Sequence, residues 1–263
     1  MVKLVGAGAF GGIMWRMNHV HTVCLATYNI HKGVQGLGPL QRLEIHNLLR
    51  AVQDLQADVV CLQEVRRFHH KLQQRFAHWP DVEQATYLAP PGYEAVYRTN
   101  AVTRYGEHGN ALLSRWPVLG VGHEDVSDHR LEQRGLLHVQ LQWGGDTTVH
   151  VLVVHLGLFH ASRERQVQRL GQFVAREIPP LARLVVAGDF NDWGVRLHRP
   201  MAALGLHTLE EARLATYPSR LPLLQLDRIY VRGLRMVSAQ VPKGRDWARM
   251  SDHLPLVAEL ALD

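Results

Sequence analysis

The 263-residue sequence contains very little cysteine. Its two cysteines, Cys24 and Cys61, lie in separate apolar segments that have the composition of buried strands. Two cysteines are too few for a disulfide framework, and the sequence has no Cys-x-x-Cys metal motif. We therefore expect both to be free, buried thiols that take no part in the chemistry.

Long hydrophobic runs are also absent. No segment approaches the ~18 consecutive apolar residues of a membrane-spanning helix, so we expect no transmembrane anchoring. Residues 4–15 are uncharged and glycine-rich and follow Lys3, but the small-residue cleavage site of a secretory signal is missing. We expect residues 1–20 to be a disordered extension, with Met1 and Met17 as alternative starts. A cytoplasmic location is preferred, and secretion is the alternative.

Lysine is scarce, and no repeat or linker rich in proline and glycine divides the chain. Four of the 29 cationic residues are lysines, so arginine dominates a formal net charge of +5. An arginine-rich surface suits anionic partners such as phosphate groups without identifying one. Hydrophobic residues make up 46% of the sequence, enough for a large core. We expect residues 21–263 to form a single domain and infer no stable protein partner.

Apolar runs typical of buried strands recur along the whole chain. We predict nine strands, at residues 22–29, 58–62, 93–97, 110–114, 135–142, 148–155, 183–188, 226–231 and 254–260. Residues 40–55 and 163–178 show the periodicity of amphipathic helices, and a weaker pattern covers 200–213. This is too strand-rich for a simple alternating strand–helix sheet. The pattern favours an α/β sandwich of two packed sheets with helices on their outer faces.

Polar side chains stand at the ends of several predicted strands. They occur in the segments TYNIHKG, DVVCLQEV, VHVLVVHLGL, RLVVAGDFND, LDRIYV and MSDHLPLVAEL. The side chains concerned are Asn29, Glu64, His155, Asp189, Asn191, Asp227, Asp252 and His253. Each alone has an ordinary explanation, such as a turn, a solvated charge or a core histidine. Because strand ends on a rigid scaffold often carry function, their joint occurrence favours one shared site.

The set contains oxygen ligands suited to a hard divalent cation. Mg²⁺ binds one or two carboxylates and keeps several waters, and Glu64 and Asp252 can supply the carboxylates. Mn²⁺ is a plausible substitute. Such a cation neutralises the charge that grows on phosphoryl oxygens, so the residues indicate metal-assisted phosphoester cleavage.

The same set contains groups that can activate water. His253 can act as a general base if Asp227 holds its other ring nitrogen. Asp189 and Asn191 can orient the water and the phosphate, and His155 can hydrogen-bond or protonate the anionic centre. No cysteine or serine nucleophile with its own base is apparent, which disfavours a covalent intermediate.

In this order, over residues 22–260, the six segments resemble the endonuclease/exonuclease/phosphatase superfamily. The resemblance implies a four-layer sandwich of two mixed sheets flanked by helices, and a metal-dependent phosphodiesterase of deoxyribonuclease-like layout. It also implies a metal site in which Glu64 is the main ligand, Asn29 lies beside it and Asp252 is an additional aspartate. One or two metals are both compatible with it.

The resemblance assigns the remaining residues by position. Asp189 and Asn191 match the pair that positions the water and the scissile phosphate, and Asp227 and His253 match the Asp–His dyad. Whether Asp189 or His253 is the base stays open. His155 matches a histidine that contacts phosphate in the deoxyribonuclease-like branch.

Weaker matches add three candidate substrate-binding residues. The segment GNALLSRWPV places Asn110 where its side chain could reach the site, and QRGLLHV places Arg134 where it could contact phosphate or a carboxylate. Structural roles for both are equally open. Trp193 could stack on a base or a lipid headgroup, or simply pack its loop.

The motifs narrow the choice among branches of the superfamily, but they do not identify the substrate. The sequences GDFNDW and LPLLQLDRIY depart from the inositol-polyphosphate 5-phosphatases, and the order Asp227-Arg228-Ile229 departs from the abasic-site endonucleases. No hydrophobic hairpin of the neutral sphingomyelinases is visible. The chain instead resembles an uncharacterised bacterial subgroup.

Nucleic acid is the preferred substrate, because the basic segment 66–71 could line a groove with phosphate contacts. A solvated helix face is the structural alternative for that segment. A phospholipid or small-molecule phosphodiester is the alternative substrate, suited to Trp193 and the apolar stretch 222–226. A decayed binding module is the remote alternative, disfavoured because the site residues are intact.

Overall fold

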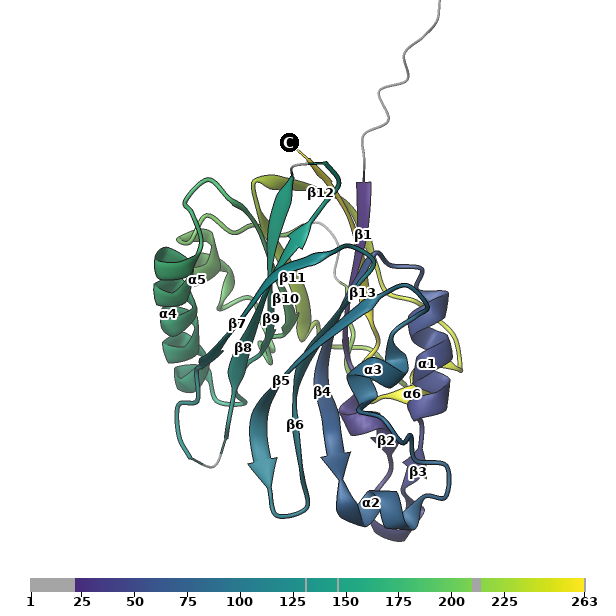
Figure 1. Cartoon of the computed structure of the whole chain (residues 1–263). Coiled ribbons are helices and arrows are strands. Elements are labelled where there is room, and N and C mark those ends of the chain that lie inside the picture. The colour runs from purple at the N-terminus through teal and green to yellow at the C-terminus, as the bar shows by residue number, and fades with distance from the viewer. Residues whose placement is uncertain (1–21, 131, 146, 210–213, 263) are drawn as a thin grey trace, which may run out of the picture.

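The computed structural model describes residues 22–130, 132–145, 147–209 and 214–262. The expected N-terminal extension, residues 1–20, lies outside these ranges. Two large sheets pack face to face between two layers of helices, so the expected four-layer α/β sandwich is confirmed (Figure 1). Among the described residues, no helix is long and apolar enough to cross a membrane.

Both large sheets are mixed. One has the strand order β12 (Leu234–Gln240), β13 (Leu256–Leu262), β1 (Thr22–Asn29), β4 (Val59–His69), β6 (Gly106–Ser114) and β5 (Glu94–Thr103). The other has the order β11 (Asp227–Arg232), β10 (Arg183–Asp189), β9 (Thr148–His155), β8 (Gly135–Gln142) and β7 (Val118–Asp125). A small sheet pairs β2 (Val34–Gln35) with β3 (Arg42–Leu43).

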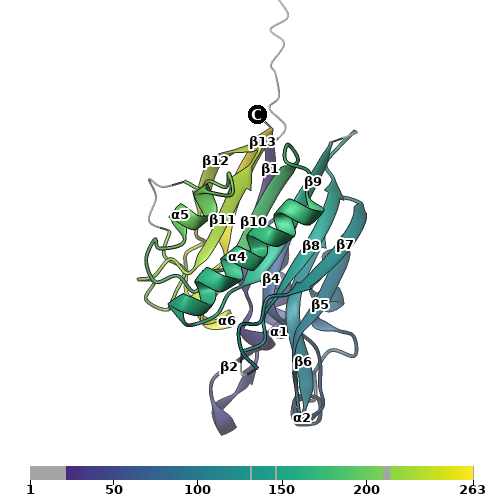
Figure 2. The ribbon, with the colours of Figure 1, turned by 90° about the vertical axis from the view of Figure 1, so that its left-hand side faces the viewer.

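Helices cover the outer faces of both sheets. The α-helices are α1 (Ile45–Asp54), α2 (His70–Arg75), α3 (Gln84–Leu88), α4 (His160–Glu177), α5 (His198–Ala202) and α6 (Trp247–Met250), and short 3-10 helices span His31–Gly33 and Gly38–Leu40. In Figure 1, α1, α3 and α6 flank the six-stranded sheet, whereas α4 and α5 flank the five-stranded one. Figure 2 shows α4 lying across that sheet.

The central strands carry long apolar runs where both of their faces are buried. In β9, Val151 and Val153 point into the core between the sheets, whereas Leu152 and Val154 pack under α4. Successive strand residues face opposite sides, so a two-sided burial requires an uninterrupted apolar run. This is the pattern from which the nine strands were predicted, and each of the nine overlaps a strand of the structure, although Asp58, Tyr93, Leu226 and residues 254–255 lie just before the observed strands.

The structure corrects several predicted boundaries. The helix predicted at 40–55 begins at Ile45, because Arg42 and Leu43 pair as a short strand. The helix predicted at 163–178 begins earlier, at His160. Of the helix predicted at 200–213, the structure shows only α5, and residues 210–213 lie outside the described ranges.

Elements that sequence periodicity missed are edge strands or very short helices. Strands β7 and β12 lie at sheet edges and expose one face, so their apolar pattern is weak. Helices α2, α3 and α6 have six, five and four residues, too few to show a period. The basic segment 66–71 is not one helix face, since β4 continues to His69 before α2 begins.

Candidate active site

Parallel strands bring the predicted residues to one end of the sandwich. In the six-stranded sheet β1 runs parallel to β4, and in the other sheet β9 runs parallel to β10. Asn29 closes β1, whereas His155 and Asp189 close β9 and β10 and are paired in register. Asp189 is also paired with Asp227, the first residue of β11. The ends of both sheets therefore converge on one point.

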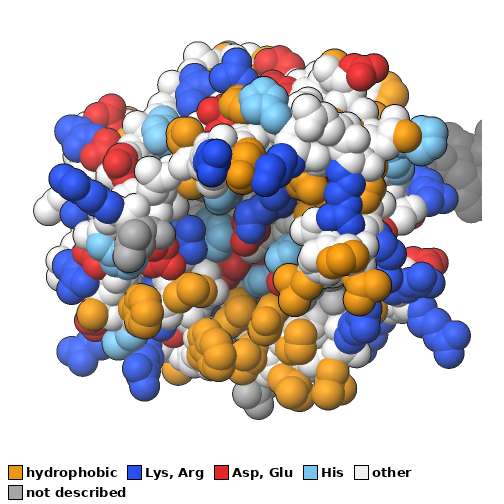
Figure 3. Space-filling model, turned by 90° about the horizontal axis from the view of Figure 1, so that it is seen from below, with side chains coloured by type: hydrophobic (Ala, Val, Ile, Leu, Met, Phe, Trp, Pro, Cys, Tyr) orange, Lys and Arg blue, Asp and Glu red, His pale blue; other side chains and the backbone are white. Residues whose placement is uncertain are grey.

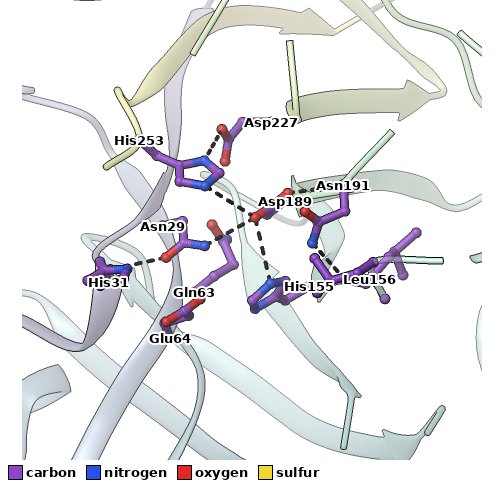
Figure 4. A network of polar contacts seen from close by, with 12 residues as sticks. Asn29, His31, Gln63, Glu64, His155, Leu156, Asp189, Asn191, Asp227 and His253 are labelled. Carbon is purple, nitrogen blue, oxygen red and sulfur yellow. Dashed lines mark hydrogen bonds and ion pairs between the residues drawn. The ribbon is translucent and has the colours of Figure 1, made fainter. Parts of the chain in front are cut away.

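Asp189 lies at the centre of this convergence (Figure 4). Its Oδ2 accepts a hydrogen bond from Asn29 Nδ2 at 3.1 Å. The Nε2 atoms of His155 and His253 lie 3.6 Å from the same oxygen, on either side. Its Oδ1 accepts the backbone N–H of Asn191 at 2.9 Å. The carboxylate is thus fixed from four directions and is almost completely buried.

His253 and Asp227 form the predicted dyad. His253 Nδ1 lies 2.8 Å from Asp227 Oδ2, and Thr216 Oγ1 donates to the same oxygen at 2.6 Å. Burial disfavours the imidazolium, but the charges of Asp227 and Asp189 outweigh burial and raise the pKa of His253 to about 10. The neighbouring Arg228 bonds to His198 and the Gly194 carbonyl rather than to Asp227.

His155 has the opposite electrostatic environment. Burial and the nearby Arg134 lower its pKa to about 4, against the smaller effects of Asp189 and Glu64. It is therefore neutral at physiological pH and can donate one ring N–H. Two histidines at equal distances from one aspartate are thus kept in different charge states.

Asn191 is held in a fixed position beside Asp189. Its Nδ2 donates to the Leu156 carbonyl at 2.9 Å, and Arg134 Nε donates to that same carbonyl at 3.2 Å.

Gly188, just before Asp189, permits the close approach of β9: a Cβ there would lie 1.9 Å from the Val154 carbonyl oxygen. The glycine of the GDFND segment is therefore required by packing.

Glu64 lies on the other side of Asn29. A register shift in β4 between Leu62 and Val65 puts Glu64 in a left-handed conformation, with φ of 57°. Lys32 Nζ lies 2.5 Å from Glu64 Oε2 in an ion pair without hydrogen-bond geometry. Burial opposes ionisation, but Lys32 and other nearby cationic groups outweigh it and lower the pKa of Glu64 well below its ordinary value.

Asp252 completes this side. Its Oδ2 lies 3.2 Å from His31 Nδ1, and the backbone N–H of His31 donates to Asn29 Oδ1 at 3.1 Å. Burial raises the pKa of Asp252, but the hydrogen bond from His31 and the nearby His253 lower it by more. Ser251 Oγ donates to the Asn29 carbonyl at 2.6 Å, which ties the SDH segment to the end of β1.

Backbone strain is concentrated at this site. Among the described residues, five non-glycine residues have a left-handed φ, and four of them are site residues: His31, Lys32, Glu64 and Asn191. Such conformations cost of order ~1–3 kcal/mol each and persist only where the surroundings impose them. Their clustering is typical of a functional site.

Two groups of residues have donor atoms suited to a metal ion. Asp189, Asp227 and His253 each place one potential ligand atom within 4.8 Å of the others. His253 Nδ1 is already bonded to Asp227, and its Nε2 carries a proton because the pKa of His253 is raised to about 10, so this imidazole is a poor ligand. The carboxylates of Glu64 and Asp252 are instead paired with Lys32 and His31. Two carboxylates beside the amide oxygen of Asn29 fit a hard divalent cation.

The weaker candidates divide into two kinds. Asn110 is buried and donates to the carbonyls of Gly135 and Val153, so it joins β6 to the opposite sheet. Arg134 bonds Glu132 and the Leu156 carbonyl rather than a site carboxylate. Trp193, two residues after Asn191, is 68% exposed.

The cysteines are free, as predicted. Cys61 is buried, whereas Cys24 is only partly buried, which corrects the expectation of two buried thiols. Burial raises the pKa of Cys24 to about 11 and that of Cys61 further, so both are protonated at neutral pH. Neither belongs to the network around Asp189.

Sequence reasoning missed the partners of the acidic residues. His31 and Lys32 stand in the TYNIHKG segment that supplied Asn29, and Thr216 begins the TYPSR segment. The signal for Lys32 was available, since it stands three residues after Asn29, a predicted metal-site residue, in a chain with only four lysines. Thr216 carried no signal that distinguishes it from a turn residue.

Residues 26–253 match the sequence profile of the Endonuclease/Exonuclease/phosphatase family. The chain belongs to this family. It is 38% identical over 247 residues to the uncharacterized protein YbhP of Escherichia coli (strain K12), a match that covers 90% of this chain and 95% of YbhP.

Solved structures of the endonuclease/exonuclease/phosphatase fold agree with this assignment. The family protein from Bacteroides vulgatus superposes with a TM-score of 0.72 at 18% identity, covering 92% of this chain and 99% of its own. D. rerio TDP2 complexed with single strand DNA product superposes with a TM-score of 0.63 at 17% identity, covering 91% and 99%. These identities support the fold alone.

Proposed function

We propose that the protein hydrolyses a phosphodiester by direct attack of water, with Mg²⁺ or Mn²⁺ as cofactor. Family membership supports a phosphoester hydrolase. The observation that carries the proposal is the position of Asp189, whose Oδ2 is faced by Asn29 at 3.1 Å and by His155 and His253 at 3.6 Å. One oriented carboxylate between two imidazoles is suited to hold a water against a phosphate.

Glu64 and Asp252 would hold the cation, with Asn29 Oδ1 beside them. When bound, a divalent ion neutralises negative charge on the phosphoryl oxygens and leaving group. The Lys32 ammonium and the His31 ring lie next to these carboxylates in the structure. Since each provides at most a single charge, a divalent ion is a stronger partner for the same oxygens.

Asp189 is the proposed base. Asn29 and the Asn191 backbone fix its two oxygens, so a water bonded to it has a defined direction of attack. His253, oriented by Asp227, presents its Nε2 toward the reacting phosphate as a hydrogen-bond donor. His155 is neutral and presents a second ring nitrogen from the opposite side. A decayed site would lack this set of contacts.

Nucleic acid as the substrate stays a prediction. D. rerio TDP2, which shares the fold, is named with a single strand DNA product, but that likeness supports the fold alone. The basic segment 66–71 on which the prediction rested has other partners: Arg67 pairs with Glu83 and Glu107 at 3.6 Å, and Lys71 lies over the Tyr105 ring.

The proposal is tested by hydrolysis of bis(p-nitrophenyl) phosphate and by nicking of supercoiled plasmid, each with Mg²⁺ and with EDTA. We expect Mg²⁺-dependent release of p-nitrophenol, at a rate that Glu64→Gln lowers by about 10³-fold or more. Glu94→Gln, on the exposed part of β5, is the matched control and should retain wild-type activity. Plasmid nicking would add nucleic acid as a substrate. Equal activity in EDTA, or in Glu64→Gln, would refute the metal-assisted mechanism.

A further inference from the structure

Three loops that leave the site carry exposed apolar side chains. Residues 156–159 follow His155, residues 192–196 follow Asn191, and residues 217–224 precede Asp227. Six large apolar side chains on these loops are 58–68% exposed: Leu158, Phe159, Trp193, Val195, Leu221 and Leu223. We call these six residues the apolar rim. Figure 3 shows hydrophobic side chains gathered along one side of a hollow that contains acidic and histidine side chains.

The loop that carries Trp193 is fixed to the protein rather than loose. Buried Arg228 bonds His198 at 2.9 Å and also bonds the Gly194 carbonyl. Buried Asp192 accepts the backbone N–H of Leu197 at 3.0 Å. Because these contacts already hold the loop in place, the loop loses little conformational entropy when a partner binds the exposed side chains between them.

The 217–224 loop is fixed to the site itself. The Tyr217 ring packs 5.0 Å from the His253 ring, and the backbone N–H of Ser219 donates to the Asp252 carbonyl at 2.7 Å. The backbone N–H groups of Leu223 and Leu224 both donate to the Tyr217 carbonyl. A partner seated on Leu221 and Leu223 would therefore lie directly beside the dyad.

The exposed charges on these two loops are all positive. Residues 191–200 and 216–226 contain one acidic residue, Asp192, which is buried. Their exposed charges are Arg196, Arg199 and Arg220, and no carboxylate in the described part of the chain forms an ion pair with them. Exposed apolar side chains flanked by free cations complement an anionic lipid surface, which offers both hydrocarbon and phosphate.

We infer that the apolar rim docks on an anionic bilayer, and that the phosphodiester cleaved is that of a phospholipid headgroup. This inference rests on the proposed hydrolase function for its substrate, although docking can be measured separately. The apolar rim would lie at the membrane–water interface, and the adjoining site would face the layer of lipid phosphates. Tryptophan side chains are favoured at this interface, which suits Trp193.

A single-stranded nucleic acid suits this surface less well. Platforms that bind bases rely on aromatic side chains, because bases stack on rings. Four of the six rim residues are aliphatic, and only Trp193 and Phe159 are aromatic. Aliphatic side chains without stacking partners are better matched to acyl chains and glycerol esters.

Flotation with vesicles tests the docking. Vesicles of phosphatidylcholine containing about one third phosphatidylglycerol are compared with pure phosphatidylcholine, using the full-length protein in EDTA so that no hydrolysis intervenes. The test variants are Leu221→Ser/Leu223→Ser and Arg220→Gln. The matched controls are Leu181→Ser and Arg235→Gln, both exposed at the opposite end of the sheets. A fluorescent single-stranded oligonucleotide is titrated in parallel.

We expect wild type and Glu64→Gln to bind the anionic vesicles equally and the neutral ones at least about tenfold more weakly. The leucine double variant should lose about tenfold or more in vesicle affinity, and the controls none. Absent vesicle binding, equal loss in test and control variants, or binding of the oligonucleotide alone would overturn the docking. Docking without hydrolysis of any phosphodiester would instead overturn the proposed function, and hydrolysis without docking would leave that function standing.

Discussion

The side of the site that holds Asp227 and His253 is built differently from the side that holds Glu64 and Asp252. On the first side, the two residues are at most 5% exposed and are joined by hydrogen bonds of 2.6–2.8 Å that include Thr216. On the second side, the side chains of Glu64 and Asp252 are 15% and 36% exposed, and their partners are side chains with at most a single positive charge.

This difference indicates which parts are fixed before substrate arrives. The Asp227–His253 side is a closed network whose geometry is set by the fold. On the Glu64–Asp252 side, the carboxylates contact Lys32 and His31, whose side chains are 28% and 35% exposed. A buried network costs much to rearrange, whereas partly exposed ion pairs are weak and exchangeable. Substitutions at four residues test this contrast.

The largest effect is expected from Glu64→Gln. Loss of the Glu64 carboxylate removes the strongest attraction for a divalent cation. The bound cation supplies several kcal/mol of transition-state stabilisation. We expect the rate of bis(p-nitrophenyl) phosphate hydrolysis at saturating Mg²⁺ to fall by about 10³-fold or more. Glu94→Gln serves as control, and a loss of less than about tenfold would exclude Glu64 as the main ligand.

His253→Ala should lower kcat by about 10²-fold, because the reacting phosphate loses a positioned imidazole. The same substitution leaves Asp227 buried without its partner, so thermal unfolding must be measured alongside. His253→Gln keeps a donor near Asp227 and separates the loss of rate from the loss of stability. If His253→Gln retained wild-type kcat, the imidazole would have no part in the reaction.

His155 should make stability pH-dependent in acid. Its pKa is lowered to about 4 in the folded state against an ordinary value of about 6.5, so folding favours the neutral form. The neutral form therefore contributes stability above pH ~6.5 that is lost as the pH falls through about 4. Between pH 7 and pH 5, wild type should lose about 2 kcal/mol of unfolding free energy relative to His155→Gln. Denaturant unfolding at both pH values measures this, and parallel losses in the two proteins would show that His155 titrates normally.

The smallest effect is expected from Lys32→Gln. If the Lys32 ammonium competes with the cation for Glu64, removing it should lower the Mg²⁺ concentration for half-maximal rate, by up to about fivefold for a partly exposed ion pair. Arg235→Gln controls for the change in net charge. An unchanged or higher Mg²⁺ requirement would show that Lys32 does not compete.

The sequence predicted that these residues would lie together, because the candidate site is made of strand ends. Asn29, His155 and Asp189 each close a buried strand, and the carboxyl ends of parallel strands meet at one edge of a sheet. The continuous apolar runs of those strands are a strong signal, since burial on both faces leaves no polar interruption until the strand ends. The strand-rich pattern favoured two packed sheets with helices on their outer faces, and the family resemblance implied the four-layer sandwich, but the strand order within each sheet was not predicted.

Other features could not be read from the sequence. The left-handed conformation of Glu64 arises from a register shift in β4, and no residue type in the segment requires it. The contact of Thr216 with Asp227 depends on the path of the loop between β10 and β11. The edge strand β7, with glycine at positions 120 and 122, exposes one face and so resembles a loop.

The contrast between the two sides is tested most directly by a Mg²⁺ titration of hydrolysis in wild type, Glu64→Gln and His253→Gln. The account predicts that Glu64→Gln raises the Mg²⁺ concentration for half-maximal rate by about tenfold or more, whereas His253→Gln lowers kcat and leaves that concentration unchanged. A raised Mg²⁺ requirement in His253→Gln, with none in Glu64→Gln, would place the cation at Asp189, Asp227 and His253 and contradict the account.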